Sequence, residues 1–273
     1  MNTSDTLHLP QITLCAVASI DPAPALRALQ ISLRGIRFGS VKLLSSVYLG
    51  EAPDIIEQIK IEPFADINGY SHFMMKNLHS YISTPYVLVV QWDGFVTDPA
   101  MWSADFLAFD YIGAPWPQFE KVRSVGNGGF SLRSRRLLEA TADPAVSAYQ
   151  PEDVGICHIN RAVLEQGFNI RIAPWEVASR FAFEREEPRS SFGFHGSFNF
   201  PDVLGDGLCT FVDQTPTKLF LNRDGRDLCL KMADSSDRRT ATAGRKLARQ
   251  LARLSPASRQ SWKTLLHTHK LCR

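Results

Sequence analysis

Short apolar runs alternate with amphipathic segments in the first third of the chain. The runs at 11–20, 40–46 and 86–90 predict strands, and the five consecutive apolar residues at 86–90 suggest a strand buried on both faces. The leucine spacing within 25–34 predicts a helix, and 71–82 has helical spacing as well. Strands that alternate with helices are typical of an α/β fold. We therefore predict an open, mostly parallel twisted sheet with helices on both faces.

The pattern is less regular beyond residue 120. We expect a glycine-rich turn entering a strand at 125–132 and helices at 133–140 and 151–165. A short strand at 169–173 and an aromatic loop at 190–200 follow. Residues 218–231 alternate around Asp224 and Gly225, which predicts a C-terminal hairpin. A basic amphipathic helix is expected at 243–254. We therefore predict a main domain at 1–230 and a basic helical tail at 231–273.

The composition excludes several classes of protein. The chain has 273 residues, of which 44% are hydrophobic, and its 17 Phe and 5 Trp exceed what disordered chains carry. No apolar run approaches the ~20 residues of a spanning helix, and the first eleven residues lack the charge of a secretory signal. The five cysteines are scattered without metal-ligand spacing. We therefore expect a cytoplasmic protein without a disulfide framework or zinc site.

Charge is divided unevenly along the chain. Residues 231–273 contain 11 Lys and Arg against two Asp (net +9), whereas the rest contains 19 against 26 Asp and Glu (net −7). Such a basic tail could bind a phosphate-bearing surface, or it could be a solvated helical face without a partner. We favour peripheral docking on an anionic membrane and expect no nucleic-acid partner. The stripe expected to mediate docking consists of Leu247, Leu251 and Leu254 beside Arg245, Lys246, Arg249 and Arg253.

Four short segments offer groups for chemistry. Asp93 follows the strand at 86–90, where a carboxylate could hold a divalent cation, although Asp-Gly is also a common turn. Glu152 and Asp153 begin a predicted helix, where they could complement the helix dipole or supply a general base. The run at 126–129 has three glycines that form a turn or a bare backbone surface for a sugar or phosphate. His195 lies in the aromatic loop, as a structural residue or a metal ligand.

These motifs occur in an order that resembles a known superfamily. The matching segments are YVLVVQWDGFV (86–96), FDYIGAPW (109–116), VGNGGFSLRSRRLL (125–138), EDV (152–154) and FGFHGSFNF (192–200). Over about residues 11–200 the sequence resembles nucleotide-sugar glycosyltransferases of the GT-A fold. It is still more similar to a family described only as a domain of unknown function and assigned to that superfamily.

The resemblance implies a donor site. QWDG stands at the Asp-x-Asp motif that holds metal and donor diphosphate, so Asp93 and Gly94 keep that role while Gln91 replaces the first Asp. His195 matches a late histidine that can ligate the metal, which implies Mn²⁺ or Mg²⁺ as cofactor. The nucleotide pocket is implied at Ala18, Ser19 and Ser46.

The resemblance also implies the catalytic and acceptor groups. The EDV carboxylate acts as the base in inverting transferases of the β-1,3 type, which points to Asp153, with Glu152 as second choice. Acceptor contacts are implied at Trp116, Asn127, Gly128 and Gly129. The rings of Tyr111, Phe130 and Trp116 could stack on an acceptor sugar, or could be ordinary core aromatics.

The implied function is transfer of a sugar from a nucleotide-diphosphate donor, with uridine diphosphate favoured, to a hydroxyl acceptor. The acceptor is expected to be a saccharide or lipid-linked precursor of a cell-surface polysaccharide or glycolipid, and the transfer to be inverting. The alternative is a catalytically weak nucleotide- or glycan-binding module on the same fold, which the replacement of the first Asp by Gln91 favours. Release of sugar from a donor distinguishes the two.

Overall fold

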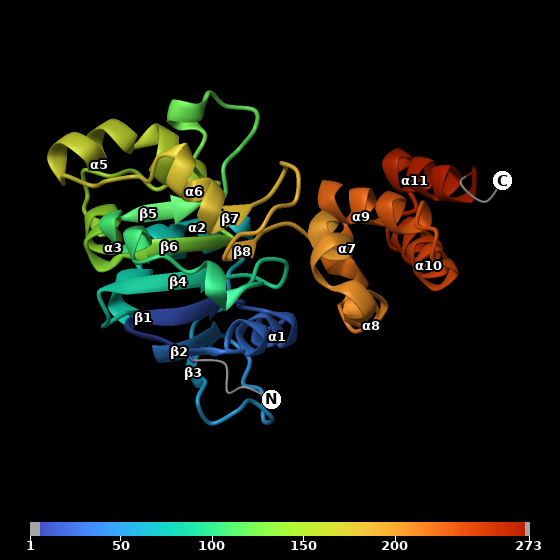
Figure 1. Cartoon of the computed structure of the whole chain (residues 1–273), viewed down its shortest axis with the longest axis horizontal. Helices are drawn as coiled ribbons and strands as arrows, with labels where there is room; N and C mark the ends of the chain where they lie inside the picture. The colour runs from blue at the N-terminus through green and yellow to red at the C-terminus, as the bar shows by residue number, and fades with distance from the viewer. Residues whose placement is uncertain (1–5, 271–273) are drawn as a thin grey trace. The chain divides into compact units, whose positions relative to one another are not determined.

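The computed structural model describes residues 6–270, and its contacts divide the chain into two compact units (Figure 1). The first unit ends at His195 and the second begins at Gly196. The expected boundary after residue 230 lies inside helix α9 (Arg223–Ala233). The first unit is α/β, and the second is helical.

Within the described residues, the main sheet of the first unit has six strands in the order β3-β2-β1-β4-β6-β5. Strands β1, β2, β3 and β4 are mutually parallel, whereas β6 runs antiparallel to β4 and β5. The predicted α/β class with a mostly parallel sheet is thus confirmed. The strands span Leu7–Val17 (β1), Ile36–Ser45 (β2), Glu57–Lys60 (β3), Tyr86–Val90 (β4), Tyr111–Gly113 (β5) and Phe130–Ser134 (β6).

The strand order reverses between β1 and β4. The chain steps from β1 outward to β2 and β3, then returns to place β4 on the other side of β1. In open α/β sheets, such a switch point opens a crevice at the carboxyl ends of the strands, where ligands bind. We call this side of the sheet the carboxyl edge. The antiparallel β6 begins there too, because Phe130 pairs with Val90 at the end of β4.

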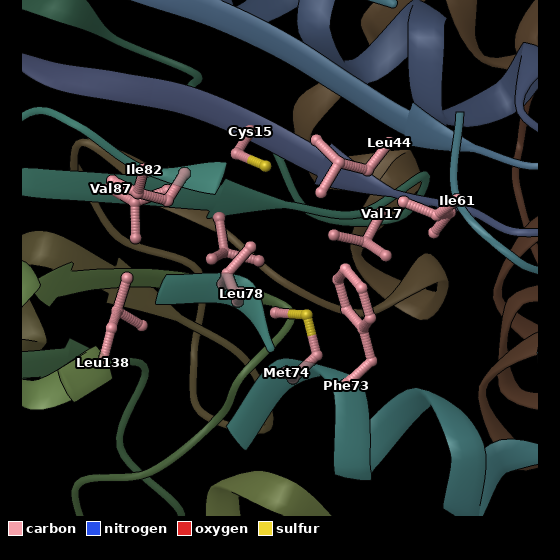
Figure 2. Packing of buried hydrophobic residues seen from close by; sticks show 11 residues of the cluster. Cys15, Val17, Leu44, Ile61, Phe73, Met74, Leu78, Ile82, Val87 and Leu138 are labelled. Carbon is pink, nitrogen blue, oxygen red and sulfur yellow. The ribbon is translucent and has the colours of Figure 1, made fainter. Parts of the chain in front are cut away.

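Helices flank the sheet. The helices α2 (Ile67–Lys76) and α3 (Arg135–Ala142), with the 3₁₀ segment Leu78–Tyr81, contribute to one buried cluster (Figure 2). Strand β1 contributes every second side chain to this cluster, because side chains alternate between the faces of a strand. Helix α1 (Ala23–Ser32) also packs against β1 and β2. The cluster comprises Cys15, Val17, Leu44, Ile61, Phe73, Met74, Leu78, Ile82, Val87, Val89 and Leu138.

Two predicted elements of the first unit differ in the structure. The helix expected at 151–165 is interrupted: α4 (Glu152–Val154) runs into a π-helical turn, Gly155–Ile159, before α5 (Arg161–Gly167). The side-chain amide of Asn160 donates to the Gly155 carbonyl at 2.9 Å, and that contact stabilises the wider turn. The strand expected at 169–173 is reduced to one bridge between Ile172 and Tyr111.

Three short elements complete the first unit. Helix α6 (Trp175–Phe181) leads directly into β7 (Ala182–Phe183), which pairs in parallel with β8 (Gly193–Phe194). The expected aromatic loop at 190–200 therefore contains a short strand. This small sheet ends at the residue that also ends the first unit, His195.

The second unit contains no hairpin among its described residues, because 218–231 is largely helical. Asn222 caps α9 by accepting from the Gly225 amide at 2.8 Å. Gly225 is needed there for close approach, since a Cβ would meet the Phe220 carbonyl oxygen at 2.2 Å. The helices span Phe200–Val203 (α7), Leu208–Asp213 (α8), Arg223–Ala233 (α9), Arg238–Leu254 (α10) and Arg259–Lys270 (α11).

The basic helix α10 packs against α9 and α11 through the leucines expected to face a membrane. Leu247 and Leu251 are each only 2% exposed, whereas Leu254 at the helix end is 55% exposed. The predicted docking stripe is therefore mostly the packing surface of the second unit. Amphipathic spacing alone could not distinguish burial against a neighbouring helix from burial in lipid.

The described residues can be compared with two expectations from the sequence, which concern membrane-spanning helices and disulfide bonds. No helix within 6–270 is both long enough and apolar enough to cross a bilayer. Cys15, Cys157, Cys209 and Cys229 are buried free thiols, and Cys272 lies outside the described residues.

Candidate functional site

The segment after β4 forms a tight turn at the carboxyl edge. The amide of Gln91 donates to the Gly94 carbonyl at 3.1 Å, and the Gly94 amide donates back at 3.0 Å. The Asp-Gly pair therefore forms the expected turn, and the turn places Asp93 in a buried position. Asp93 is 6% exposed, and no hydrogen bond reaches its Oδ1 from any described residue. A buried carboxylate oxygen without a partner is costly unless a cation offsets its charge.

Backbone pairing brings His195 to this carboxylate. Val96 bridges Gly193, and β7 pairs with β8 so that Phe183 lies opposite Phe194. The residues that follow these two strands, Glu184 and His195, therefore emerge side by side. His195 Nδ1 lies 3.0 Å from Glu184 Oε1, and its Nε2 lies 3.5 Å from Asp93 Oδ1.

The imidazole of His195 is held between two carboxylates. Burial by itself lowers the pKa of His195, but the charges of Asp93 and Glu184 outweigh it and hold the pKa well above its usual range. His195 is therefore positively charged at neutral pH unless another cation takes over this role. The charge balances the anionic pair in a site with little access to water.

The same atoms fit a hard divalent cation. Asp93 Oδ1 accepts no hydrogen bond from the described residues but lies 3.5 Å from His195 Nε2, and Gln91 Oε1 lies 3.4 Å from the same nitrogen. Glu184 on Nδ1 is the outer carboxylate that usually orients a ligating histidine. No group of three or more His, Cys, Asp or Glu side chains within 6–270 is placed to hold a metal. The protein donors are thus one carboxylate, one imidazole and one amide oxygen, which leaves positions for phosphate and water.

The glycine-rich loop packs around this group. Asn127, at a positive φ of 46°, places its Nδ2 2.8 Å from His195 Nδ1. A Cβ at Gly129 would lie 2.1 Å from His195 Nε2, and one at Gly128 would lie 2.3 Å from Glu152 Oε1. The bare backbone expected to receive a sugar is therefore covered by the protein's own side chains. The glycines allow the loop to approach those side chains closely.

Asp153 lies on the other side of this loop. Its Oδ2 accepts from the Gly128 amide at 2.9 Å, and its Oδ1 accepts from the Val154 amide at 2.8 Å. Burial, with the nearby charge of Glu152, nevertheless raises the pKa of Asp153 to about 6. A carboxylate with a pKa of about 6 suits a general base at neutral pH, being ionised yet more basic than a surface Asp.

Glu152 is engaged in a buried ion pair. Its Oε1 lies 3.1 Å from Nη2 of Arg133, which is fully buried and also donates to the Gly128 carbonyl at 3.2 Å. This pairing gives Glu152 a structural contact with Arg133, whereas Asp153 is held by backbone amides. Sequence reasoning missed Arg133 and placed it in a helix. The alternation of Ser131 and Arg133 on one face of β6 could have indicated a buried polar pair.

The residues expected to hold the nucleotide lie at the ends of β1 and β2. The Ser46 hydroxyl and amide both donate to the Ser19 carbonyl, and the Ser19 hydroxyl accepts from the Phe64 amide. The Ala18 amide donates to the Leu44 carbonyl at 3.0 Å. Ser46 also lines a cavity of about 210 Å³ beside Val47, Tyr48 and Lys60, whereas Ala18 and Ser19 do not. These serines thus tie the strand ends together, and only Ser46 borders open space.

The expected acceptor rings are buried. Tyr111 and Phe130 have no exposed surface, and Trp116 stacks on His158 with ring centroids 5.6 Å apart. The Trp116 ring also covers Gly126, where a Cβ would meet it at 2.1 Å. These aromatics are core residues in this structure, so acceptor stacking on them is not supported.

Comparison with known proteins adds one finding. The model of the family described as "Protein of unknown function (DUF5672)" matches residues 55–195. The matched segment covers just over half of the chain and includes Gln91, Asp93, Asp153, Glu184 and His195. No curated protein matches the chain.

Proposed function

The chain belongs to the DUF5672 family, and we propose that it is an inverting glycosyltransferase that uses a nucleotide-diphosphate sugar. One observation carries this proposal. A single loop, Asn127–Gly129, contacts both the Asp93–His195 group and the base candidate Asp153, at the carboxyl edge of an α/β sheet. A transferase needs such an arrangement, with a cationic site for a leaving diphosphate near a base for the incoming hydroxyl.

In this proposal the donor diphosphate binds beside the group formed by Asp93, His195 and Gln91, where a bound cation would offset its negative charge. Asp93, His195 and Gln91 are the residues that would hold Mn²⁺ or Mg²⁺, with Glu184 orienting the imidazole. A divalent ion bound there supplies neutralisation of the charge on the leaving phosphate. The donor sugar must then pass the loop Asn127–Gly129 to reach Asp153.

Asp153 activates the acceptor. Its carboxylate takes the proton of the acceptor hydroxyl as that oxygen attacks the anomeric carbon from the face opposite the diphosphate. The bond from the anomeric carbon to the phosphate oxygen breaks, and the nucleoside diphosphate leaves with the electron pair. The anomeric configuration is inverted because the displacement is direct. The Gly128 amide holds Asp153 in place at 2.9 Å while the proton moves.

The substrate classes follow from the family resemblance. A uridine diphosphate sugar is the favoured donor, and the acceptor is a saccharide or a lipid-linked precursor of a surface polysaccharide or glycolipid. We place the reaction in the cytoplasm, with the chain at the inner face of a membrane where such precursors are assembled.

A binding module that does not turn over is the second candidate. Gln91 favours it, because this residue stands where an acidic ligand is expected and its Nε2 donates to the Tyr70 hydroxyl at 2.8 Å. An amide is a weaker metal ligand than a carboxylate. A module of this kind would bind a nucleotide or glycan and release no sugar.

Nucleotide release separates the two candidates. The chain is incubated with Mn²⁺ and with UDP-, GDP- and dTDP-sugars, and released nucleotide is measured across pH. The transferase releases nucleotide from one class, with a rate that rises with pH through about 6 as Asp153 ionises. Asp153→Asn lowers this rate by ~10²–10⁴ and leaves donor binding intact. Donor binding without release in the wild-type chain would support the binding module.

A further inference from the structure

Helix α11 has an inverted pattern of burial. Its inward side chains are small and hydroxylated, since Ser261, Thr264 and Thr268 are all buried. Two of its large apolar side chains are exposed, Trp262 by 46% and Leu266 by 62%, while Leu265 is half-buried. A helix that only completes the second unit would have the opposite pattern. Exposed large apolar side chains on an otherwise packed helix indicate a surface for another partner.

Two of the buried hydroxyls form hydrogen bonds within α11 itself. Thr264 donates to the Gln260 carbonyl at 3.0 Å, and Thr268 donates to the Leu265 carbonyl at 2.8 Å. These local bonds let a polar face pack inward at little cost. The arrangement leaves Trp262 and Leu266 with apolar surface in water.

Two of the exposed residues share one face of α11, and a third lies at the end of α10. Trp262 and Leu266 are four residues apart and thus lie on the same face of α11. The indole Nε1 of Trp262 donates to the Pro256 carbonyl at 2.8 Å, which fixes the ring beside the turn that follows α10. Leu254, the last residue of α10, is 55% exposed two positions before that proline. We call Leu254, Trp262 and Leu266 the apolar face.

Two basic side chains flank this face. Arg259 and Lys263 are exposed and lie on the same side of α11, three residues before Trp262 and Leu266 respectively. Residues 238–273 contain ten Lys and Arg and no Asp or Glu. An acidic or neutral protein surface would match the apolar residues, but so uniform a charge is matched best by a dense anionic surface. Tryptophan flanked by basic residues is characteristic of the boundary between headgroups and acyl chains.

We propose that the apolar face of the second unit docks onto an anionic lipid bilayer. Trp262, Leu254 and Leu266 enter the headgroup boundary, and Arg259 and Lys263 contact lipid phosphates. The helix α11 lies in the plane of the surface, because its buried face is occupied by α9 and α10. The docking surface is therefore α11 with the end of α10, in place of the leucine stripe that the sequence indicated.

Vesicle co-sedimentation of the full chain tests this surface. Vesicles of phosphatidylglycerol and phosphatidylcholine (about 3:7) should bind the chain, and vesicles of phosphatidylcholine alone should bind it much more weakly. Trp262→Ala with Leu266→Ser should weaken binding roughly tenfold or more. Arg259→Gln with Lys263→Gln should weaken it about fivefold for each charge removed, and the salt dependence should fall.

Matched controls keep the outcome interpretable. Tyr48→Ala removes an aromatic ring that is 76% exposed in the first unit and should leave vesicle binding unchanged. Circular dichroism confirms that each variant is folded, and Leu266→Ser alone serves as a milder variant. Equal binding of wild type and the Trp262/Leu266 variant overturns the proposal. The proposal is also overturned if the chain does not bind anionic vesicles but forms a dimer that Trp262→Ala dissociates. In that case the apolar face contacts a second copy of the chain. Neither result depends on glycosyl transfer.

Discussion

Replacing the base candidate should make the protein more stable. Asp153→Asn removes a buried negative charge and keeps one oxygen that can accept from the Gly128 amide, while the bond that the other oxygen accepts from the Val154 amide is lost. The pKa of Asp153 is raised from 3.8 to about 6, mainly by burial and then by the charge of Glu152. At 1.36 kcal/mol per pKa unit, the ionised carboxylate costs the folded state about 3 kcal/mol.

The sign of this effect fixes its pH dependence. The folded-state pKa lies above the unfolded one, so the cost is fully present above about pH 6 and disappears as the pH falls toward 3.8. Asp153→Asn should therefore raise the free energy of unfolding by up to about 3 kcal/mol at pH 8. The gain should nearly vanish at pH 4. For a unit of this size, 3 kcal/mol corresponds to roughly 6–12 °C in Tm.

Thermal unfolding at pH 8, 6 and 4 measures this difference. Asp98→Asn is the matched control, because Asp98 is exposed and its Oδ1 also accepts from a backbone amide, that of Ala100 at 2.9 Å. It should change stability by less than about 0.5 kcal/mol at every pH. An Asp153→Asn protein that melts at or below the wild-type temperature at pH 8 refutes the reasoning. A gain that persists unchanged at pH 4 refutes it equally.

Three further perturbations test the groups around the loop. Glu184→Gln should lower Mn²⁺ affinity by roughly 10–100-fold in calorimetry, because the imidazole loses its outer carboxylate; unchanged affinity removes this residue from the site. Gly129→Ala should destabilise the fold by about 1–3 kcal/mol, because its Cβ would meet the imidazole, whereas Gly167→Ala, with open space around it, should not. Arg133→Met should cost about 3–5 kcal/mol in urea unfolding by leaving Glu152 unpaired, and adding Glu152→Gln should recover part of that loss.

The sequence predicts the parallel core of the fold well. The strand at 86–90 has the predicted bounds, because five consecutive apolar residues after a proline suit only a strand buried on both faces. The segment 218–231 was misassigned, because Asp224–Gly225 is a turn signal when read alone. The residue that decides the structure is Asn222, whose side chain caps a helix across that pair.

The candidate site is only partly accessible from the sequence. The structure gathers Asp93, His195 and the glycine-rich loop, as the order of the motifs suggests. Arg133 and Glu184 were missed, because their roles depend on partners brought together only by strand pairing. The glycine-rich run predicts either a turn or an open backbone surface for a ligand. Whether a bare backbone faces a ligand or a side chain is a matter of packing, which local composition does not specify.

Binding of nucleotides to the Asp93 group tests the central proposal most directly. Calorimetric titration with UDP, GDP, dTDP and CMP, each with and without Mn²⁺, needs no knowledge of the sugar or the acceptor. We expect one nucleoside diphosphate to bind, with an affinity that Mn²⁺ increases. Asp93→Asn should abolish the Mn²⁺ effect, while Asp153→Asn and the control Asp98→Asn should retain binding. If no nucleotide binds, or if Asp93→Asn binds as the wild type does, the proposed donor site is contradicted.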